Sequence, residues 1–271
     1  MEVSYNMLRL IASDLDGTLL RDGAQTLPEE TVPLIRQLLD KGIYFATATG
    51  RQYHNLQMLF APIKDRIFYI TENGSLVFAD GKVIARGGFS QDLSQRILTD
   101  LSQEPGIETM VSTERCCYIS DRSKAFQYHV LHELKNKTTV CKDLLHIPEP
   151  VIKIAIYDTA QNDASLEKIL QHYKNAYRDE LKVVTSGNSW IDFIAPNANK
   201  GTALQALLDY LHLTSEECMV FGDQYNDLEM LKLAGTSYAM TTCAPGVEKY
   251  ADYQTDTVEE ILKELLDQLD R

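Results

Sequence analysis

One short stretch near the amino terminus constrains the fold of this chain more than any other. Residues 8–13 are mostly apolar, and the sequence Asp-Leu-Asp-Gly-Thr follows at once at positions 14–18. This abrupt change predicts a buried strand whose carboxyl end opens into a site, because open α/β sheets bind ligands at such strand ends. The carboxylates of Asp14 and Asp16 would share a small volume there, and oxygen ligands suit a hard cation such as Mg²⁺. A simple turn is the alternative, since Asp, Gly and Thr all favour turns.

Polar residues also follow three further predicted strands, residues 43–48, 67–71 and 218–221. The polar or small residues that come after these strands include Thr49, Gly50, Arg51, Asn73, Asp223, Asn226 and Asp227. A helix that starts near the end of the second strand would aim free N–H groups at an anion. Strands that alternate with helices predict an α/β fold with a mainly parallel, Rossmann-like sheet.

Each of these side chains also has a plainer interpretation. Thr49 would serve as the N-cap of a helix, and Arg51 would be a solvated helix residue. Asn73-Gly74 is a common hairpin turn, so for Asn73 we weigh turn and site equally. Asp227 would suit the first turn of the helix that follows it.

Lys200 stands at the amino end of a helix whose apolar face is formed by residues 203–211. A cation is unfavourable there because it lies near the positive pole of the helix dipole. A frayed surface lysine is the plain alternative. A lysine at this position therefore needs a more specific explanation.

Between residues 85 and 192 the pattern changes. Alternating stretches such as 107–111 and 152–156 predict half-buried, antiparallel strands, and apolar helical faces accompany them. We therefore expect a core made of residues 1–84 and 193–271, interrupted by an inserted α+β unit of residues 85–192. Element boundaries read from a sequence are uncertain by several residues.

Charge and composition limit the classes of function. The chain has 271 residues and a formal net charge of -13, which argues against a sequence-independent nucleic-acid binder because such proteins need a basic face. The first apolar run is far shorter than a signal-peptide core or a membrane span. The five cysteines are odd in number and contain no Cys-x-x-Cys pair. We therefore expect a cytoplasmic protein with reduced thiols, and no membrane partner.

These motifs, in this order, resemble those of the haloacid dehalogenase superfamily of phosphohydrolases, and specifically its Cof-type branch. The matching sequences are Asp-x-Asp-Gly-Thr at 14–18, Thr-Gly at 49–50, Asn-Gly at 73–74, Lys-Gly at 200–201 and Gly-Asp-x-x-Asn-Asp at 222–227. The resemblance covers essentially the whole chain, and it implies that residues 85–192 form the large cap of this branch. One departure is the sequence Thr-Thr-Cys at 241–243, where Cof-type chains usually have Met-Gly-Asn-Ala after the last strand.

The resemblance implies a Mg²⁺-dependent phosphatase that acts on small phosphorylated metabolites, most simply sugar phosphates. Asp14 would be the nucleophile that forms an aspartyl-phosphate, and Asp16 the general acid and base. Thr49 and Lys200 would hold the transferring phosphoryl oxygens. The other phosphate-binding residues would be Leu15 through its backbone, Gly50, Arg51, Asn73 and Asn226. The metal ligands would be Asp14, Asp16 through its carbonyl, and Asp223, with Asp227 beside them to orient Lys200 or a water on the metal.

Three rival functions on the same fold are weighed against this one. A dehalogenase is disfavoured because it would lack the second acid, Asp16. A phosphomutase would transfer the phosphoryl group to a sugar hydroxyl instead of water, and the sequence leaves it open. A non-enzymatic sensor of phosphorylated ligands would usually have lost Asp14 or Asp16, and both are present.

Overall fold

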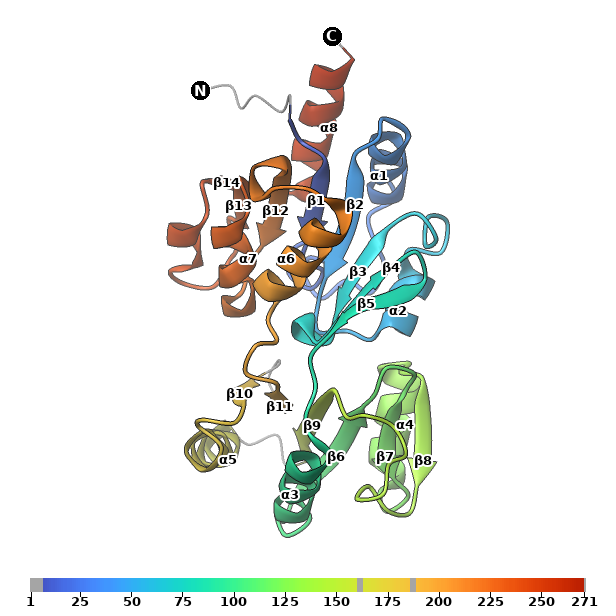
Figure 1. The fold of residues 1–271 in the computed structure, drawn as a ribbon, viewed down its shortest axis with the longest axis vertical. Coiled ribbons are helices and arrows are strands. Elements are labelled where there is room, and N and C mark those ends of the chain that lie inside the picture. Colours follow the sequence, from blue (N-terminus) through green and yellow to red (C-terminus); the bar gives the residue numbers. More distant parts are fainter. Residues whose placement is uncertain (1–6, 160–162, 186–188, 271) are drawn as a thin grey trace. The chain divides into compact units, whose positions relative to one another are not determined.

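A computed structural model describes residues 7–159, 163–185 and 189–270. The chain divides into two compact units. The core unit is built from residues before Arg86 and after Ala198, and the inserted unit is Arg86–Ala198. Figure 1 shows both units, and each is described by itself below.

The core unit is organised on one sheet with the strand order β14-β13-β12-β1-β2-β3-β4-β5. Its strands are β1 (Leu10–Ser13), β2 (Tyr44–Ala48), β3 (Phe68–Thr71), β4 (Leu76–Ala79), β5 (Lys82–Arg86), β12 (Cys218–Gly222), β13 (Thr236–Met240) and β14 (Tyr253–Thr255). Neighbouring strands from β14 to β3 pair in parallel, and β4 pairs antiparallel with β3. The predicted α/β class with a mainly parallel sheet is therefore confirmed.

Helices cover both faces of this sheet, as the unbroken apolar strands require. They are α1 (Thr31–Asp40), α2 (Tyr53–Leu59), α6 (Lys200–Leu211), α7 (Leu228–Leu233) and α8 (Val258–Leu269). Successive strand residues point to opposite faces, so Leu10 and Ala12 pack with Leu204 and Leu207 of α6, whereas Ile11 lies buried on the other face. The parallel pairing brings the carboxyl ends of β1, β2, β3 and β12 to one edge of the sheet.

The inserted unit has its own sheet, with the order β10-β11-β9-β6-β7-β8. Its strands are β6 (Ile107–Ser112), β7 (Cys117–Ser120), β8 (Thr138–Cys141), β9 (Lys153–Asp158), β10 (Lys182–Thr185) and β11 (Trp190–Ile194). The pairs are antiparallel, as predicted, except that β7 and β8 run parallel. The helices α3 (Gln91–Leu101) and α5 (Asp163–Ala176) share one apolar cluster with Ile154 and Phe193, and α4 (Lys124–Tyr128) packs in a second cluster through Phe126.

The breaks between the two units differ from the expected boundaries by one residue at the start of the inserted unit and by six at its end. The structure places the breaks after Ala85 and after Ala198 instead of after residues 84 and 192. The reason is β11, which continues to Ile194 and pairs with Lys153 of β9 and Lys182 of β10. A break after residue 192 would have divided β11 in the middle of its ladder.

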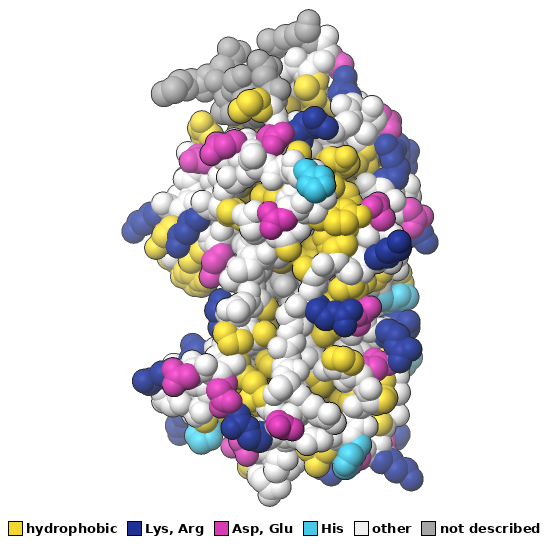
Figure 2. All heavy atoms as spheres, in the orientation of Figure 1, with side chains coloured by type: hydrophobic (Ala, Val, Ile, Leu, Met, Phe, Trp, Pro, Cys, Tyr) yellow, Lys and Arg dark blue, Asp and Glu magenta, His cyan; other side chains and the backbone are white. Residues whose placement is uncertain are grey.

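On the face shown in Figure 2, basic and acidic side chains are interspersed. None of the helices in the described part of the chain is both long and apolar enough to cross a membrane. The absence of a nucleic-acid partner stays a prediction, as does the cytoplasmic location.

Candidate active site

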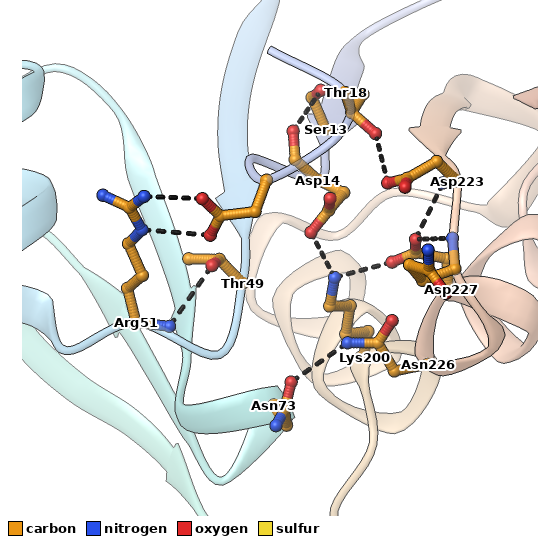
Figure 3. Close-up of polar contacts among 12 residues, drawn as sticks. Ser13, Asp14, Thr18, Thr49, Arg51, Asn73, Lys200, Asp223, Asn226 and Asp227 are labelled. Carbon is orange, nitrogen blue, oxygen red and sulfur yellow. Dashed lines mark hydrogen bonds and ion pairs between the residues drawn. The ribbon is translucent and has the colours of Figure 1, made fainter. Parts of the chain in front are cut away.

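The carboxyl end of β1 delivers Asp14 into a buried polar cluster. The backbone N–H of Asp14 still donates to the carbonyl of Phe221 on β12 at 2.9 Å, which continues the parallel ladder into the site. Its carboxylate Oδ1 accepts a hydrogen bond from Lys200 Nζ at 2.5 Å (Figure 3). Burial raises the pKa of Asp14 well above its ordinary value, and the ammonium of Lys200 opposes that rise.

Lys200 is the first residue of α6, and its environment explains why a cation occupies that place. Asn199 caps the helix by accepting from the backbone N–H of Thr202 at 2.8 Å. The side chain of Lys200 is only 1% exposed, and Nζ contacts Asp14 at 2.5 Å and Asp227 at 2.6 Å. Burial alone would lower the pKa of Lys200, but the two carboxylates raise it above its ordinary value. The two aspartates therefore explain why a cation occupies this position.

Both carboxylate oxygens of Asp227 accept hydrogen bonds from groups of the core unit. Its Oδ1 accepts from Lys200, and its Oδ2 accepts from the backbone N–H groups of Asp223 and Gln224, each at 2.9 Å. A Cβ on Gly222 would lie 2.6 Å from the Cβ of Asp227, so the tight turn after β12 depends on that glycine. These contacts favour the expected role of Asp227 in orienting Lys200.

Asp223 faces the turn that follows β1. Its Oδ1 accepts from the hydroxyl of Thr18 at 2.9 Å. Gly17 has φ +96°, and a Cβ there would lie 2.2 Å from Asp223 Oδ2, so the turn passes directly against this carboxylate. Sequence reasoning gave Thr18 no role, although the hydroxyl at the end of the Asp-x-Asp-Gly-Thr motif was the available signal.

The residues present fit a hard divalent cation. Ligand atoms of Asp14, Asp223 and Asp227 all lie within 4.8 Å of one another, and all three side chains are buried. Burial also raises the pKa of Asp223, and the negative charge of Asp227 adds to the rise. The cluster offers only oxygen ligands, which suits Mg²⁺ rather than a softer metal.

Asp16 lies apart from this cluster and points toward Arg51. Nε and Nη2 of Arg51 donate to the two oxygens of Asp16 at 3.0 and 2.5 Å. The Asp16 side chain is 53% exposed. Arg51 therefore does bind an anion, which is the carboxylate of Asp16. A contact of Arg51 with phosphate stays a prediction.

Thr49 is buried at the end of β2, and its hydroxyl accepts from the backbone N–H of Arg51 at 3.2 Å. The next helix, α2, begins at Tyr53 with Gln52 at the N-cap. The N-cap interpretation of Thr49 is therefore wrong, because three residues separate it from the helix. Gly50 lies close to Asn73, since a Cβ there would be 3.1 Å from Asn73 Oδ1.

Asn73 lies in a turn and also contacts Asn226, another predicted site residue. It has φ 57° within the 3-10 turn Glu72–Gly74, which connects the antiparallel pair β3 and β4. Its Oδ1 accepts from Asn226 Nδ2 at 3.1 Å (Figure 3). The two alternatives left open by the sequence are thus compatible. Leu15 is fully buried, so its side chain belongs to the core, and a contact of its backbone with phosphate stays a prediction.

The unusual segment at 241–243 lies next to Asp223, a predicted metal ligand, which the following residue contacts. The backbone N–H of Ala244 donates to the carbonyl of Asp223 at 2.8 Å, and Thr241 Oγ1 donates to Asp256 at 2.5 Å. Burial raises the pKa of the Cys243 thiol, which disfavours a reactive thiolate. Ala244, the residue after the segment, therefore supports the backbone of a predicted metal ligand.

Comparisons with known proteins agree with this geometry. The family model of haloacid dehalogenase-like hydrolases matches residues 11–265. The 5-amino-6-(5-phospho-D-ribitylamino)uracil phosphatase YbjI of Escherichia coli is 27% identical, and the match covers 94% of this chain and 97% of that protein. The HMP-PP phosphatase of Cronobacter sakazakii is 30% identical, with 88% and 86% covered.

A solved structure from Eubacterium rectale superposes with a TM-score of 0.86 at 28% identity, covering 96% of this chain and 100% of that one. The match of the family model spans both parts of the core unit and the whole inserted unit. The order of motifs, the sheet topology and these comparisons lead to one conclusion: the chain belongs to the haloacid dehalogenase-like hydrolases, in their Cof-type branch.

Proposed function

We propose that this chain is a Mg²⁺-dependent phosphatase that hydrolyses small phosphate monoesters through an aspartyl-phosphate on Asp14. One observation carries the proposal: three buried carboxylates lie within 4.8 Å of one another, and the ammonium of Lys200 contacts two of them, Asp14 and Asp227. Such a cluster keeps an excess of negative charge, which favours a bound divalent cation.

The metal would be held by Asp14, Asp223 and the backbone carbonyl of Asp16. When bound, Mg²⁺ supplies positive charge that reduces the repulsion between an anionic nucleophile and an anionic phosphate. Lys200 would contribute a second positive charge, since its ammonium contacts Oδ1 of Asp14.

In the first step Asp14 attacks phosphorus, a carboxyl oxygen–phosphorus bond forms, and the bond to the leaving oxygen breaks. Asp16 gives its proton to that leaving oxygen. In the second step water attacks the phosphoryl group, Asp16 takes a proton from the water, and Asp14 is released. The exposure of Asp16 supports both exchanges.

Other residues would hold the transferring group in place. Lys200 and Thr49 are assigned to its oxygens, with Asn226 and the Leu15 backbone as further donors. Asp227 fixes Lys200, because its own contacts to backbone N–H groups leave it immobile.

The substrate we propose is a small phosphorylated metabolite, with sugar phosphates as the simplest class. Two relatives are named as phosphatases of 5-amino-6-(5-phospho-D-ribitylamino)uracil and of HMP-PP. The core motifs are assigned only to phosphate, metal and water, so we assign the choice of leaving group to the inserted unit. Replacing residues 86–198 by the corresponding segment of another member should change the ranking of substrates and leave the metal dependence unchanged.

The test of this function is hydrolysis of an aryl phosphate with and without Mg²⁺, followed by a panel of phosphorylated metabolites. We expect turnover only with Mg²⁺ or a similar hard divalent ion, and none with Asp14→Asn. Turnover that survives exhaustive chelation would show that the carboxylate cluster does not work through a metal. Transfer of phosphate to a second sugar hydroxyl would favour the phosphomutase alternative, and binding without turnover would favour a sensor.

A further inference from the structure

A series of contacts connects the last helix of the chain to Asp223. Glu259 lies in the first turn of α8, and its Oε2 accepts from Arg21 Nη1 at 2.9 Å. The same Nη1 donates to the carbonyl of Thr18 at 3.1 Å. The hydroxyl of Thr18 then donates to Asp223 Oδ1 at 2.9 Å. Three hydrogen bonds therefore separate a helix far along the chain from a predicted metal ligand.

Glu259, at one end of this series of contacts, is buried. Glu259 is 1% exposed, and its other oxygen, Oε1, accepts from the hydroxyl of Thr31 at 2.5 Å. A buried carboxylate with both oxygens hydrogen-bonded is held in one orientation, and the bond from Arg21 is charge-assisted. Loss of Arg21 would leave the Glu259 charge buried without its guanidinium, which is costly.

The turn after β1 connects the contact of Arg21 to the contact of Thr18 with Asp223. The backbone N–H of Leu20 donates to the carbonyl of Leu15 at 2.7 Å, and that of Gly17 donates to the carbonyl of Leu20 at 2.8 Å. Because the turn is closed in this way, fixing the carbonyl of Thr18 also fixes its hydroxyl. Gly17 also packs so closely against Asp223 that no space remains between the turn and the carboxylate.

Docking of α8 is the plain structural explanation for Glu259. An acidic side chain in the first turn of a helix interacts favourably with the helix dipole. Glu260 stands in the same first turn, however, and is exposed. The dipole therefore accounts for an acid at either position, and it does not account for the burial of Glu259 against Arg21.

We infer that Arg21 and Glu259 are positioning residues that hold Asp223 in the orientation for metal binding, through Thr18. The inference rests on the proposed Mg²⁺ site. It predicts that changes at Arg21 and Glu259 weaken metal binding although neither side chain contacts the predicted metal ligands directly.

The experiment measures Mn²⁺ binding by electron paramagnetic resonance, and Mg²⁺ binding by calorimetry, on chelator-treated full-length protein. Removal of a group that holds a metal ligand typically costs about 10–100-fold in affinity. We expect about tenfold for Thr18→Val and about three- to tenfold for Arg21→Met and Glu259→Gln, which act one step further away. Glu260→Gln is the matched control and should bind like the wild type.

Two further readouts separate positioning from stability. Arg21→Lys keeps a donor for both acceptors and should restore part of the affinity. At saturating Mg²⁺, kcat of Arg21→Met and Glu259→Gln should recover while the substrate KM stays unchanged. Thermal unfolding in chelator records any loss of stability separately, and Glu259→Gln and Arg21→Lys keep the test available should Arg21→Met fail to fold.

The failures are distinguishable. Wild-type metal affinity in Arg21→Met and Glu259→Gln, even with a lowered Tm, would overturn the inference and leave the proposed function intact. Undiminished metal binding by Asp223→Asn would instead overturn the proposed metal site, and the inference with it.

Discussion

Replacement of Lys200 by methionine tests the electrostatic basis of the site. Methionine has a similar length and no charge, so the change removes the two contacts at 2.5 and 2.6 Å to Asp14 and Asp227. The cluster of three buried carboxylates then loses the ammonium that contacts two of its members. We expect activity to be lost and the core unit to be destabilised.

The size of the destabilisation follows from burial. Removing one partner of a buried ion pair costs about 3–5 kcal/mol, and 1 kcal/mol shifts Tm by about 2–4 °C for a chain of 150–250 residues. We therefore expect Tm in chelator to fall by roughly 6–20 °C. Lys263→Met is the matched control, because Lys263 pairs with Glu30 on the surface and should cost less than about 1 kcal/mol.

Metal and pH should modify the effect with predictable signs. Mg²⁺ should raise the Tm of Lys200→Met more than that of the wild type, because the ion replaces the lost charge. Burial raises the pKa of Asp14, and loss of Lys200 removes the charge that opposes this rise. The native variant then binds a proton more readily than the unfolded chain, so stability falls as pH rises between the two pKa values. The deficit should be larger at alkaline than at mildly acidic pH.

Circular dichroism and fluorescence together provide the assay. The only tryptophan of the chain, Trp190, lies in the inserted unit. Its fluorescence therefore reports that unit, whereas the helical signal reports both units. A loss no larger than that of Lys263→Met, measured in chelator, would refute the view that Lys200 is the main compensating charge for Asp14.

Two further predictions concern backbone space and proton transfer. Gly74→Ala should lower the free energy of unfolding by about 2–5 kcal/mol, since φ is +89° and the Cβ would lie 2.2 Å from the Asn199 carbonyl oxygen. Gly81→Ala, at φ +72° with open space around it, should cost only about 1–2 kcal/mol. Equal losses of Tm in the two variants would contradict this prediction. Arg51→Met should lower turnover of alkyl phosphates at least about tenfold more than that of nitrophenyl phosphate, because a good leaving group needs less protonation by Asp16. Equal losses on both substrates would show that Arg51 does not orient the acid.

The sequence predicted the place of the site because parallel pairing has a strict consequence. Side chains that follow parallel strands meet at one edge, so Asp14, Thr49 and Asp223 come together from distant parts of the chain. The place of Lys200 at a helix terminus showed that it needs an explanation, and its role was implied by the family resemblance. The structure supplies two carboxylates that contact it.

The contacts that sequence reasoning missed depend on side-chain choice and tertiary packing. Arg51 pairs with Asp16 across two turns. The sequence alone does not say which of the nearby carboxylates the guanidinium contacts. The contacts from Glu259 through Arg21 to Thr18 exist only because α8 packs beside the turn after β1. The end of the inserted unit was misplaced because the ladder partners of Ile194 cannot be read from its own neighbours in the sequence.

Trapping the covalent intermediate tests the central claim most directly. The protein would be mixed with a phosphorylated substrate and Mg²⁺, quenched in acid, reduced with borohydride and mapped by mass spectrometry. An aspartyl-phosphate is reduced to homoserine, so we predict homoserine at position 14 and nowhere else, and none in Asp14→Asn. Reduction at another aspartate, or turnover with an unmodified Asp14 throughout, would contradict the assignment of Asp14 as the nucleophile.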